Sequence, residues 1–165
     1  MARVVTKIGN VFSVKLDDNN KKYFQYVAND LTQLNSDVIR VFKKVYPINE
    51  NPDLSEVVKD EIEFYAHCVT SLGIKLGVWE KAGKAAIEEK LDILFRGSRD
   101  SGIKLGDEPV TISDKWYVWK INEDFKYVGI LEGENKKAEI GMVINPLSII
   151  HRMRTGKYDF IYPGY

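Results

Sequence analysis

The residues of this 165-residue sequence best suited to acid–base or nucleophilic chemistry are two histidines and one cysteine: His67, His151 and Cys68. A metal or acid–base site needs carboxylates or a nucleophile converging on a histidine. The two histidines lie in separate predicted elements, so we expect each to be a structural or surface residue. Cys68 falls on the apolar face of a predicted strand, where a thiol behaves as a small hydrophobe with a raised pKa.

Paired carboxylates are the other groups that could take part in chemistry, at Asp17–Asp18 and Glu88–Glu89. Calcium loops need a regular spacing of several oxygen ligands, which neither pair offers. The sequence also has no glycine-rich phosphate loop, dinucleotide fingerprint, serine elbow or two-histidine zinc helix. We therefore predict no cofactor, no metal site and no enzymatic activity. An enzyme with an unfamiliar site stays a third hypothesis, which requires a pocket that gathers a histidine with carboxylates.

Basic and aromatic residues interleave in the segments "KKYFQY", "VFKKVY" and "KWYVWK", as they do on a base-stacking sheet. Lys plus Arg and Asp plus Glu each total 24, so bulk charge indicates no polyanionic partner. We expect a protein partner, with a nucleic-acid-binding or regulatory small-barrel protein as the alternative. That alternative requires six lysines to share one surface: Lys21, Lys22, Lys43, Lys44, Lys115 and Lys120.

Aromatic side chains make up 12% of the sequence and are the best candidates for contacts with a protein partner. Partly exposed aromatic residues often dominate the binding energy of protein interfaces. Strand alternation places three of them opposite the predicted dry face of the sheet: Tyr23, Tyr65 and Trp116. We expect these three to be exposed anchors, and the expectation fails if they are buried in the protein's own core.

The elements that must position these side chains begin with three predicted strands in the first 46 residues. Phe12, Val14 and Leu16 share one face of the first strand, as in a half-buried sheet. The run "DDNN" after it supplies residues that favour a hairpin turn. The predicted strands are 10–16, 21–27 and 37–46.

The middle of the chain mixes helix and strand signals. We predict a short helix near 52–59 and a strand at 61–70 with Ile62, Phe64, Ala66 and Cys68 on its dry side. Residues 73–79 are expected to pair with that strand, and the helix formers of 84–95 indicate a helix. Trp79 is expected to plug one end of the sheet, with Gly77 and Gly83 making room for its ring.

The last third of the chain is predicted to contain a loop, a hairpin, a strand and a helix. The polar run 96–108 is a long loop that is either mobile or used for contact. The predicted hairpin joins 115–121 to 125–131 across the turn 122–124, and 138–144 is a further strand. Asn145, Pro146 and Gly156 indicate the cap, first turn and end of a helix near 146–155.

These elements together indicate a single domain, residues 1–165, of the α+β class. We predict a mainly antiparallel β-sheet curled toward a small barrel, with a few short helices. One cysteine excludes an internal disulfide, and the sequence opening has no apolar core of a signal peptide. No apolar run is long enough to span a bilayer. We therefore expect a cytoplasmic protein without a membrane partner, whereas the oligomeric state is unknown.

The segments "KIGNVFSVKLDDNNKKYFQYV", "SDVIRVF" and "GVWEKAG" resemble immunity protein family 26, small bacterial proteins of polymorphic toxin systems. The resemblance covers roughly the first 85 residues. Members tend to open with a Gly-Asp-x-Phe strand and carry a later Gly-x-Trp segment. This sequence departs at Asn10, where the family has Asp, and at Gln25 and Tyr26, where a glycine is common. The resemblance implies a non-enzymatic protein that neutralises a cognate toxin protein by binding it.

Overall fold

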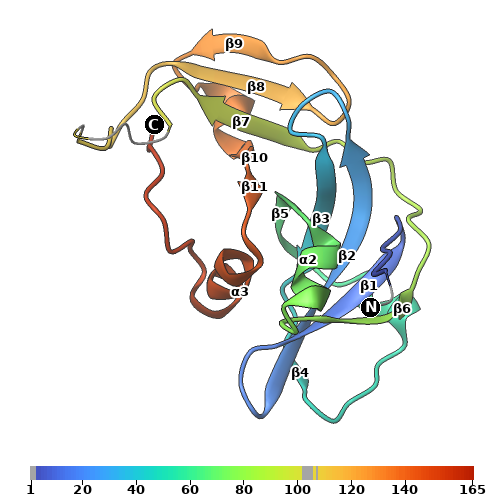
Figure 1. Ribbon diagram of the computed structural model, residues 1–165. Coiled ribbons are helices and arrows are strands. Elements are labelled where there is room, and N and C mark those ends of the chain that lie inside the picture. Colours follow the sequence, from blue (N-terminus) through green and yellow to red (C-terminus); the bar gives the residue numbers. More distant parts are fainter. Residues whose placement is uncertain (1–2, 102–105, 107) are drawn as a thin grey trace.

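The protein consists of two open β-sheets and a few short helices, as seen in a computed structural model that describes residues 3–101, 106 and 108–165 (Figure 1). The large sheet has seven strands in the order β11-β5-β3-β2-β1-β6, with β4 paired to β2, and the small sheet has the order β10-β7-β8-β9. The strands are β1 Asn10–Lys15, β2 Asn20–Asp30, β3 Ser36–Phe42, β4 Tyr46–Pro47, β5 Ile62–Cys68, β6 Glu80–Lys84, β7 Leu94–Ser98, β8 Trp116–Lys120, β9 Lys126–Gly129, β10 Glu139–Ile140 and β11 Val143–Ile144.

The predicted α+β class with mostly antiparallel strands is confirmed. The β1–β2 and β8–β9 hairpins form where the sequence places them, and only the β10–β7 and β11–β5 pairs of the described residues are parallel. The expected curl toward a barrel is not found. Each sheet has two free edges in the described part of the chain, so neither closes on itself.

The described helices are α1 Leu54–Val57, α2 Thr70–Lys75, the 3₁₀ helix η1 Gly133–Lys137 and α3 Pro146–Thr155. The prediction for α3 is confirmed in detail. The side chain of Asn145 accepts a hydrogen bond from the Leu147 amide at 2.9 Å, and Gly156 ends the helix in the left-handed conformation at φ 86°. The short helix near 52–59 also forms, with Asp53 as its N-cap. None of these helices has both the length and the apolar character to cross a membrane.

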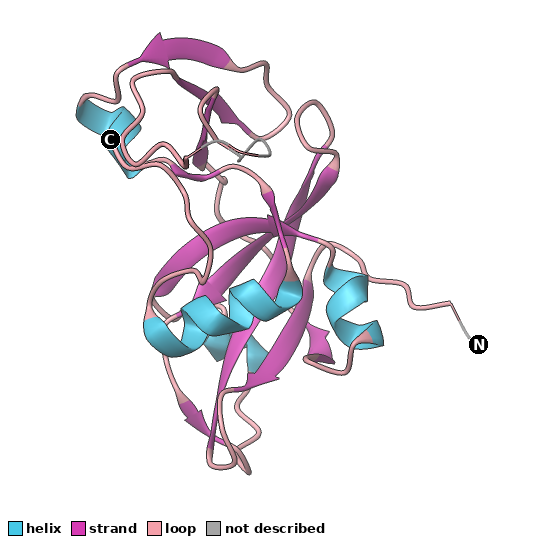
Figure 2. Ribbon diagram, turned by 60° about the vertical axis from the view of Figure 1, so that its left-hand side comes forward, coloured by secondary structure: helices cyan, strands magenta, loops and turns pink. Residues whose placement is uncertain are grey.

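One face of the large sheet packs against α2 and α3. Phe12, Phe24 and Phe64 from three different strands join Ile149 and Met153 of α3 in a single buried cluster. The alternation predicted for β1 and β5 correctly identifies this face. Figure 2 shows helices both in front of and behind this sheet.

The opposite face of the large sheet is buried under α1, the connection 85–93 and the small sheet. Val27 and Val38 of the large sheet pack in one cluster with Phe95 and Trp119 of the small sheet. A second cluster joins Val57 of α1 to the same face. The expected single domain stays a prediction, which this shared packing favours.

Two predicted elements of the middle segment are wrong. Residues 84–95 do not form a helix, because the segment runs extended across the sheet and packs Ile87 and Leu91 on the cluster of Val27 and Val38. Residues 73–79 do not pair with β5, because α2 begins at Thr70. Short apolar segments are ambiguous between the two periodicities, and tertiary packing decides between them.

Two further expectations need correction. The strand predicted at 138–144 divides, because β10 joins the small sheet and β11 joins the large one. The loop predicted at 96–108 begins later, because 96–98 belong to β7, and its residues 102–105 and 107 lie outside the described part of the chain.

Trp79 is a core residue, as predicted, but a different glycine makes room for it. Its indole lies directly against Gly73 of α2, and its Nε1 donates to the Thr70 carbonyl oxygen at 2.8 Å. Gly77 has a positive φ of 71° and open space around it, so it turns the chain without contacting the ring.

Candidate partner-binding surface

The structure buries two of the three aromatic residues expected to be partner anchors. Tyr23 is 3% exposed and packs edge-on against Tyr46, with ring centroids 5.3 Å apart. Trp116 is 0% exposed, and its Nε1 donates to the carbonyl oxygen of Ser113. The expectation of exposed anchors is wrong for both, because strand alternation identified their face correctly but that face is covered too.

Tyr65 is half-buried and remains a predicted partner contact. It lines a pocket of about 470 Å³ between the two sheets, together with Lys120 and Glu139. Burial raises the pKa of the Tyr65 hydroxyl, and it raises the pKa of the Glu139 carboxyl as well, although Arg152 opposes the latter shift.

His67, one of the two histidines that could have served in chemistry, lies in a closed polar cluster centred on Asp30. The carboxylate Oδ2 of Asp30 contacts His67 Nε2 at 2.9 Å and accepts from Trp119 Nε1 at 2.8 Å, and both His67 and Asp30 are 0% exposed. Oδ1 of the same carboxylate accepts from the amide of Asn122. Asp30 therefore joins β2 and β5 of the large sheet to β8 of the small one, at a site that is closed to solvent.

The charges in this cluster follow from its hydrogen bonds. Burial raises the pKa of Asp30, but the bonds from Trp119 and His67 outweigh burial and hold that pKa below its usual value. Burial lowers the pKa of His67 despite the charge of Asp30. Nδ1 of His67 is buried and has no hydrogen-bond partner among the described residues, so a proton there would create an unpaired N–H. His67 is therefore neutral beside an ionised Asp30.

This arrangement predicts a loss of stability in weak acid. The pKa of His67 is below 6.5 in the folded protein, so the unfolded chain takes up a proton first as the pH falls below about 6.5. The free energy of unfolding then falls, by at most about 1.4 kcal/mol per pH unit for one proton. Urea titrations at pH 7 and pH 5 measure the slope. The variant His67→Gln, which cannot titrate, should show a smaller decrease than the parent; an equal decrease would contradict this assignment.

The remaining candidates for chemistry are also separated or buried. His151 lies on α3 and His67 on β5, and Cys68 is fully buried, which raises the pKa of its thiol. The described residues contain no group of three His, Cys, Asp or Glu side chains placed to hold a metal. The pair Glu88 and Glu89 does not act as one unit, because Glu89 bonds Nη1 of the buried Arg40 at 2.7 Å.

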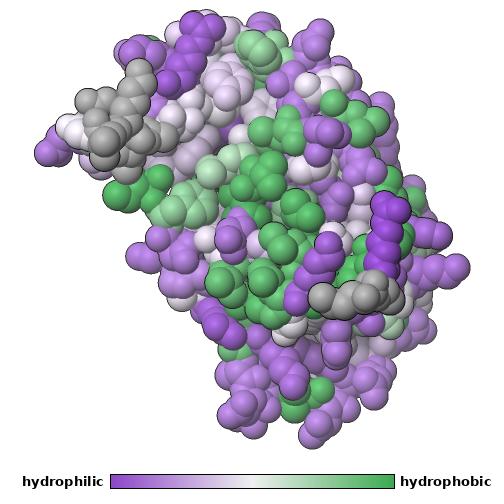
Figure 3. Space-filling model, viewed as in Figure 1, coloured by the Kyte–Doolittle hydropathy of each residue, from purple (hydrophilic) through white to green (hydrophobic). Residues whose placement is uncertain are grey.

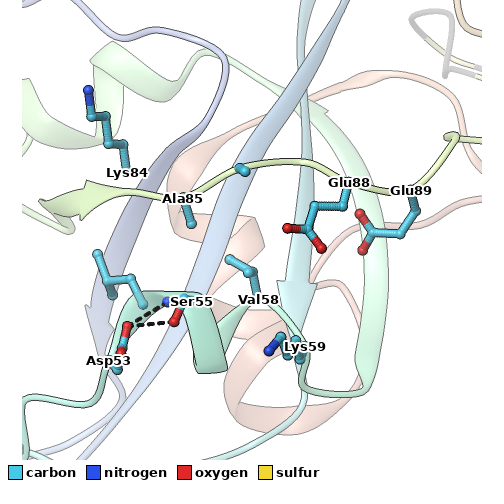
Figure 4. Close-up of a pocket in the computed structure, with 10 residues that line it drawn as sticks. Asp53, Ser55, Val58, Lys59, Lys84, Ala85, Glu88 and Glu89 are labelled. Carbon is cyan, nitrogen blue, oxygen red and sulfur yellow. Dashed lines mark hydrogen bonds between the residues drawn. The ribbon is translucent and has the colours of Figure 1, made fainter.

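The pocket beside these glutamates is drawn in Figure 4. It has a volume of about 280 Å³ and lies between α1 and the extended connection that follows β6. Asp53 is engaged with the amide and hydroxyl of Ser55 as the cap of α1, and Glu89 is engaged with Arg40. Asp53 and Glu89 are thus used to stabilise local structure.

The six lysines required by the nucleic-acid alternative do not share a surface. Lys21 and Lys22 are buried on β2, and Lys22 pairs with Glu63 at 2.9 Å. Lys115 precedes β8 of the small sheet and Lys120 ends it, at the opposite end of the molecule from β4 (Figure 1), and the two pair with Asp100 and Asp92. This dispersal gives no support to a stacking sheet.

The structure instead leaves an apolar stripe of α2 uncovered. Val69, Leu72 and Leu76 are 42%, 37% and 52% exposed, and their spacing places them along one side of the helix. The opposite side, with Thr70 and Gly73, packs on the protein's own core. This stripe is not predicted from the sequence, because residues 73–79 were expected to form a strand.

The apolar stripe continues onto β11 and α3. Val143 pairs with His67, two residues before Val69, so β11 brings Met142 and Val143 beside the start of α2. α2 and α3 are in contact, and the exposed Leu147 lies on α3. Figure 3 shows apolar side chains gathered in the middle of this side of the molecule. The apolar surface is defined here as Val69, Leu72, Leu76, Met142, Val143 and Leu147.

A pocket adjoins the apolar surface at Met142. It has a volume of about 610 Å³ and lies between the small sheet and the C-terminal tail. Gly97, Tyr117 and Gly141 line one side, and Phe160 and Ile161 of the tail line the other. An apolar surface that ends in a pocket of this size is suited to anchoring side chains of a protein partner.

Comparison with known proteins decides the class to which the chain is assigned. The family model of immunity protein 26 matches residues 7–108, more than half of the chain. The chain belongs to the immunity protein 26 family. The resemblance predicted from the first 85 residues is therefore confirmed, and the match extends further, to residue 108. No curated protein and no solved structure matches.

The apolar surface of this immunity protein 26 chain combines residues inside and outside the matched region. Val69, Leu72 and Leu76 of α2 lie within residues 7–108, whereas β11 and α3 follow them. Because α3 supplies Ile149 and Met153 to the same core as β1 and β5, the C-terminal part is integral to the face on which the surface lies.

Proposed function

We propose that this immunity protein 26 chain neutralises a cognate toxin by binding it directly in the cytoplasm of a bacterium, without catalysis. The family assignment supports the class of partner, a toxin protein of a polymorphic toxin system. The partner docks on the apolar surface of α2, β11 and α3. Release of water from exposed leucine and valine side chains supplies the main driving force of such binding.

The uncovered stripe on α2 is the observation that carries this proposal. A protein that works alone normally turns its apolar helix residues inward, and contiguous apolar patches mark interaction sites. Here Leu72 and Leu76 point away from the core although the helix is anchored on both flanks. The hydroxyl of Thr70 bonds the carboxylate of Asp37, and Trp79 packs on Gly73. A rigid element that presents leucines outward is suited to a preformed contact.

The fate of the ionisable groups supports a role without catalysis. In the described residues the His67–Asp30 pair is sealed from solvent, and Glu89 is engaged by Arg40. General acid–base chemistry needs such groups within hydrogen-bond reach of a bound substrate. The apolar surface presents carbon atoms rather than proton donors and acceptors, so it is suited to binding a protein and not to acid–base catalysis.

Co-expression tests the proposal. The chain is expressed with the toxin encoded by the gene beside its own, and growth is compared with that of cells expressing the toxin alone. We expect rescue of growth and a stable complex that elutes as one peak in size-exclusion chromatography. Rescue without a complex would point to catalysis and overturn the proposal.

Substitutions on the apolar surface should abolish binding without unfolding the protein. A carboxylate at Leu72 or Leu147 faces solvent in the free chain but would lie in an apolar contact in the complex. We expect Leu72→Asp and Leu147→Asp each to weaken the complex by about 30-fold or more, as measured by calorimetry. The matched control is Val45→Asp, which changes an apolar residue 46% exposed near β4. Equal affinity of all three variants would place the contact elsewhere.

A further inference from the structure

The pocket beside Met142 differs in charge from four other pockets on the described part of the chain. Each of those four combines basic and acidic side chains in its lining. Among the described residues that line the pocket beside Met142, the one charged group is the carboxylate of Asp159. Three aromatic side chains share this lining: Tyr117, Phe160 and Tyr162. The pocket therefore joins an apolar wall to a single negative charge.

The Asp159 carboxylate has no ion-pair or hydrogen-bond partner among the described residues. Arg154 and Lys15 line a neighbouring pocket together with Asp159, but Arg154 directs Nη2 to the carbonyl oxygen of Lys15 at 3.4 Å. Neither cation lines the pocket beside Met142. Asp159 is exposed in the free chain, where water solvates its charge. A partner that fills the pocket displaces this water, and an unpaired carboxylate in an apolar contact is strongly unfavourable.

The tail that carries Asp159 is fixed at both of its ends. It leaves α3 at Gly156 and runs back to the small sheet (Figure 1). There the amide of Gly164 donates to the carbonyl oxygen of Thr111 at 2.8 Å, and the amide of Ser113 donates to the carbonyl oxygen of Gly164 at 2.9 Å. The wall of the pocket that the tail forms is therefore in place before a partner binds, which lowers the entropy cost of binding.

We propose that this pocket receives a long basic side chain of the toxin, an arginine or a lysine. This inference rests on the proposed function and names the chemistry of the contact. The charged end of the side chain pairs with the Asp159 carboxylate, and its aliphatic stem packs on the rings of Tyr117 and Phe160. Because Met142 belongs both to the pocket and to the apolar surface, the basic residue lies beside the apolar contact of α2, β11 and α3.

The same features disfavour two other kinds of occupant. A phosphate group or an acidic side chain would meet the negative charge of Asp159 and find no cation among the described residues that line the pocket. A purely apolar side chain would fit the aromatic wall but would displace water from Asp159 without replacing it. A basic side chain with a long aliphatic stem satisfies both the wall and the charge.

Substitution of Asp159 tests this inference. The affinity for the purified toxin encoded beside the gene is measured by calorimetry for the variants Asp159→Asn and Asp159→Lys. We expect the first to bind at least about tenfold more weakly than the parent and the second at least about 100-fold more weakly. The control Glu50→Lys makes the same change in net charge at an exposed residue after β4, and its affinity should stay within about twofold of the parent.

Nitrogen-15 NMR of the free chain tests the chemistry of the pocket without the toxin. The amide signals of Gly97 and Gly141, which line the pocket, are followed while N-acetyl-arginine amide is added at millimolar concentration. N-acetyl-norleucine amide is the neutral probe of similar length. We expect the arginine probe to shift both signals with a dissociation constant at least about fivefold lower than that of the norleucine probe. Asp159→Asn should remove this preference.

The possible outcomes separate this inference from the proposed function. If both Asp159 variants keep the parent's affinity while Leu72→Asp abolishes binding, the apolar surface is right and the basic contact is wrong. Equal affinity for the two probes, or no shift with the arginine probe, also overturns the inference. If the parent chain forms no complex with the toxin although the arginine probe binds, the proposed function fails and the preference of the pocket stands.

A dimer of the free chain that Asp159→Lys separates would make a second copy the occupant, which overturns the inference as well. Sedimentation of the parent and of this variant measures the oligomeric state. Circular dichroism and thermal unfolding confirm that each variant is folded.

Discussion

Replacement of Asp30 by asparagine should lower the free energy of unfolding by about 3 kcal/mol, a large part of the stability of a domain of this size. Oδ2 of Asp30 accepts from His67 and Trp119, and Oδ1 accepts from the backbone amide of Asn122. An asparagine amide can accept on one side only. In either orientation its NH₂ group faces an N–H donor in a site without solvent, so at least one buried polar group loses its partner.

Urea unfolding followed by tryptophan fluorescence measures this effect, because Trp119 lies in the cluster itself. Asp18→Asn is the matched control, since Asp18 is exposed in the turn after β1, and its midpoint should stay within the range of ordinary surface substitutions. An Asp30→Asn midpoint equal to that of the control would show that the carboxylate does not hold the two sheets together.

Asp30 also shows where prediction from sequence reaches its limit. Asp30 lies between the predicted strands 21–27 and 37–46, and nothing in its neighbours marks it as buried. Its partners His67, Trp119 and Asn122 are 37 to 92 residues away along the chain. Local periodicity carries no information on such distant pairings, so a satisfied buried carboxylate is invisible until the sheets are placed.

Strand alternation, in contrast, was correct where it was applied to single elements. It identified the dry face of β1 and of β5, and the capping residues identified α3 to within a residue. For Tyr23 and Trp116 the predicted face is correct, but the predicted exposure of that face is wrong. Alternation says which side chains share a face, but whether that face meets water depends on other elements, here α1 for Tyr23 and the residues around Leu131 for Trp116.

The candidate surface was missed for a related reason. The apolar residues at 69, 72 and 76 have helical spacing, but the glycine at 73 and the apolar 74 and 78 between them fit strand alternation equally well. Tertiary contacts decide for the helix, since Thr70 bonds Asp37 and Trp79 packs on Gly73. A sequence pattern can therefore mark these residues as apolar without showing that they point outward.

The contact between Gly73 and Trp79 predicts a second large effect. A Cβ at position 73 would lie 1.9 Å from Cε2 of the indole of Trp79, which is 4% exposed. Alanine is the better helix former by about 1 kcal/mol, yet overpacking of this kind costs about 3 kcal/mol. We therefore expect Gly73→Ala to lower the free energy of unfolding by about 2 kcal/mol in urea titrations. Ser71→Ala in the same helix is the control and should change it little.

A smaller side chain at position 79 should reverse part of the stability loss caused by Gly73→Ala. Trp79→Leu alone removes packing on Phe24 and the hydrogen bond to the Thr70 carbonyl, so it is destabilising by itself. In the double variant with Gly73→Ala, the added methyl group occupies space that the indole has left. The loss of unfolding free energy in the double variant should therefore be smaller than the sum of the two single-variant losses, by more than about 1 kcal/mol. Additive costs would contradict direct contact. Because the same contact fixes α2, Gly73→Ala should also weaken toxin binding, whereas the double variant should recover it by returning Leu72 and Leu76 to the apolar surface.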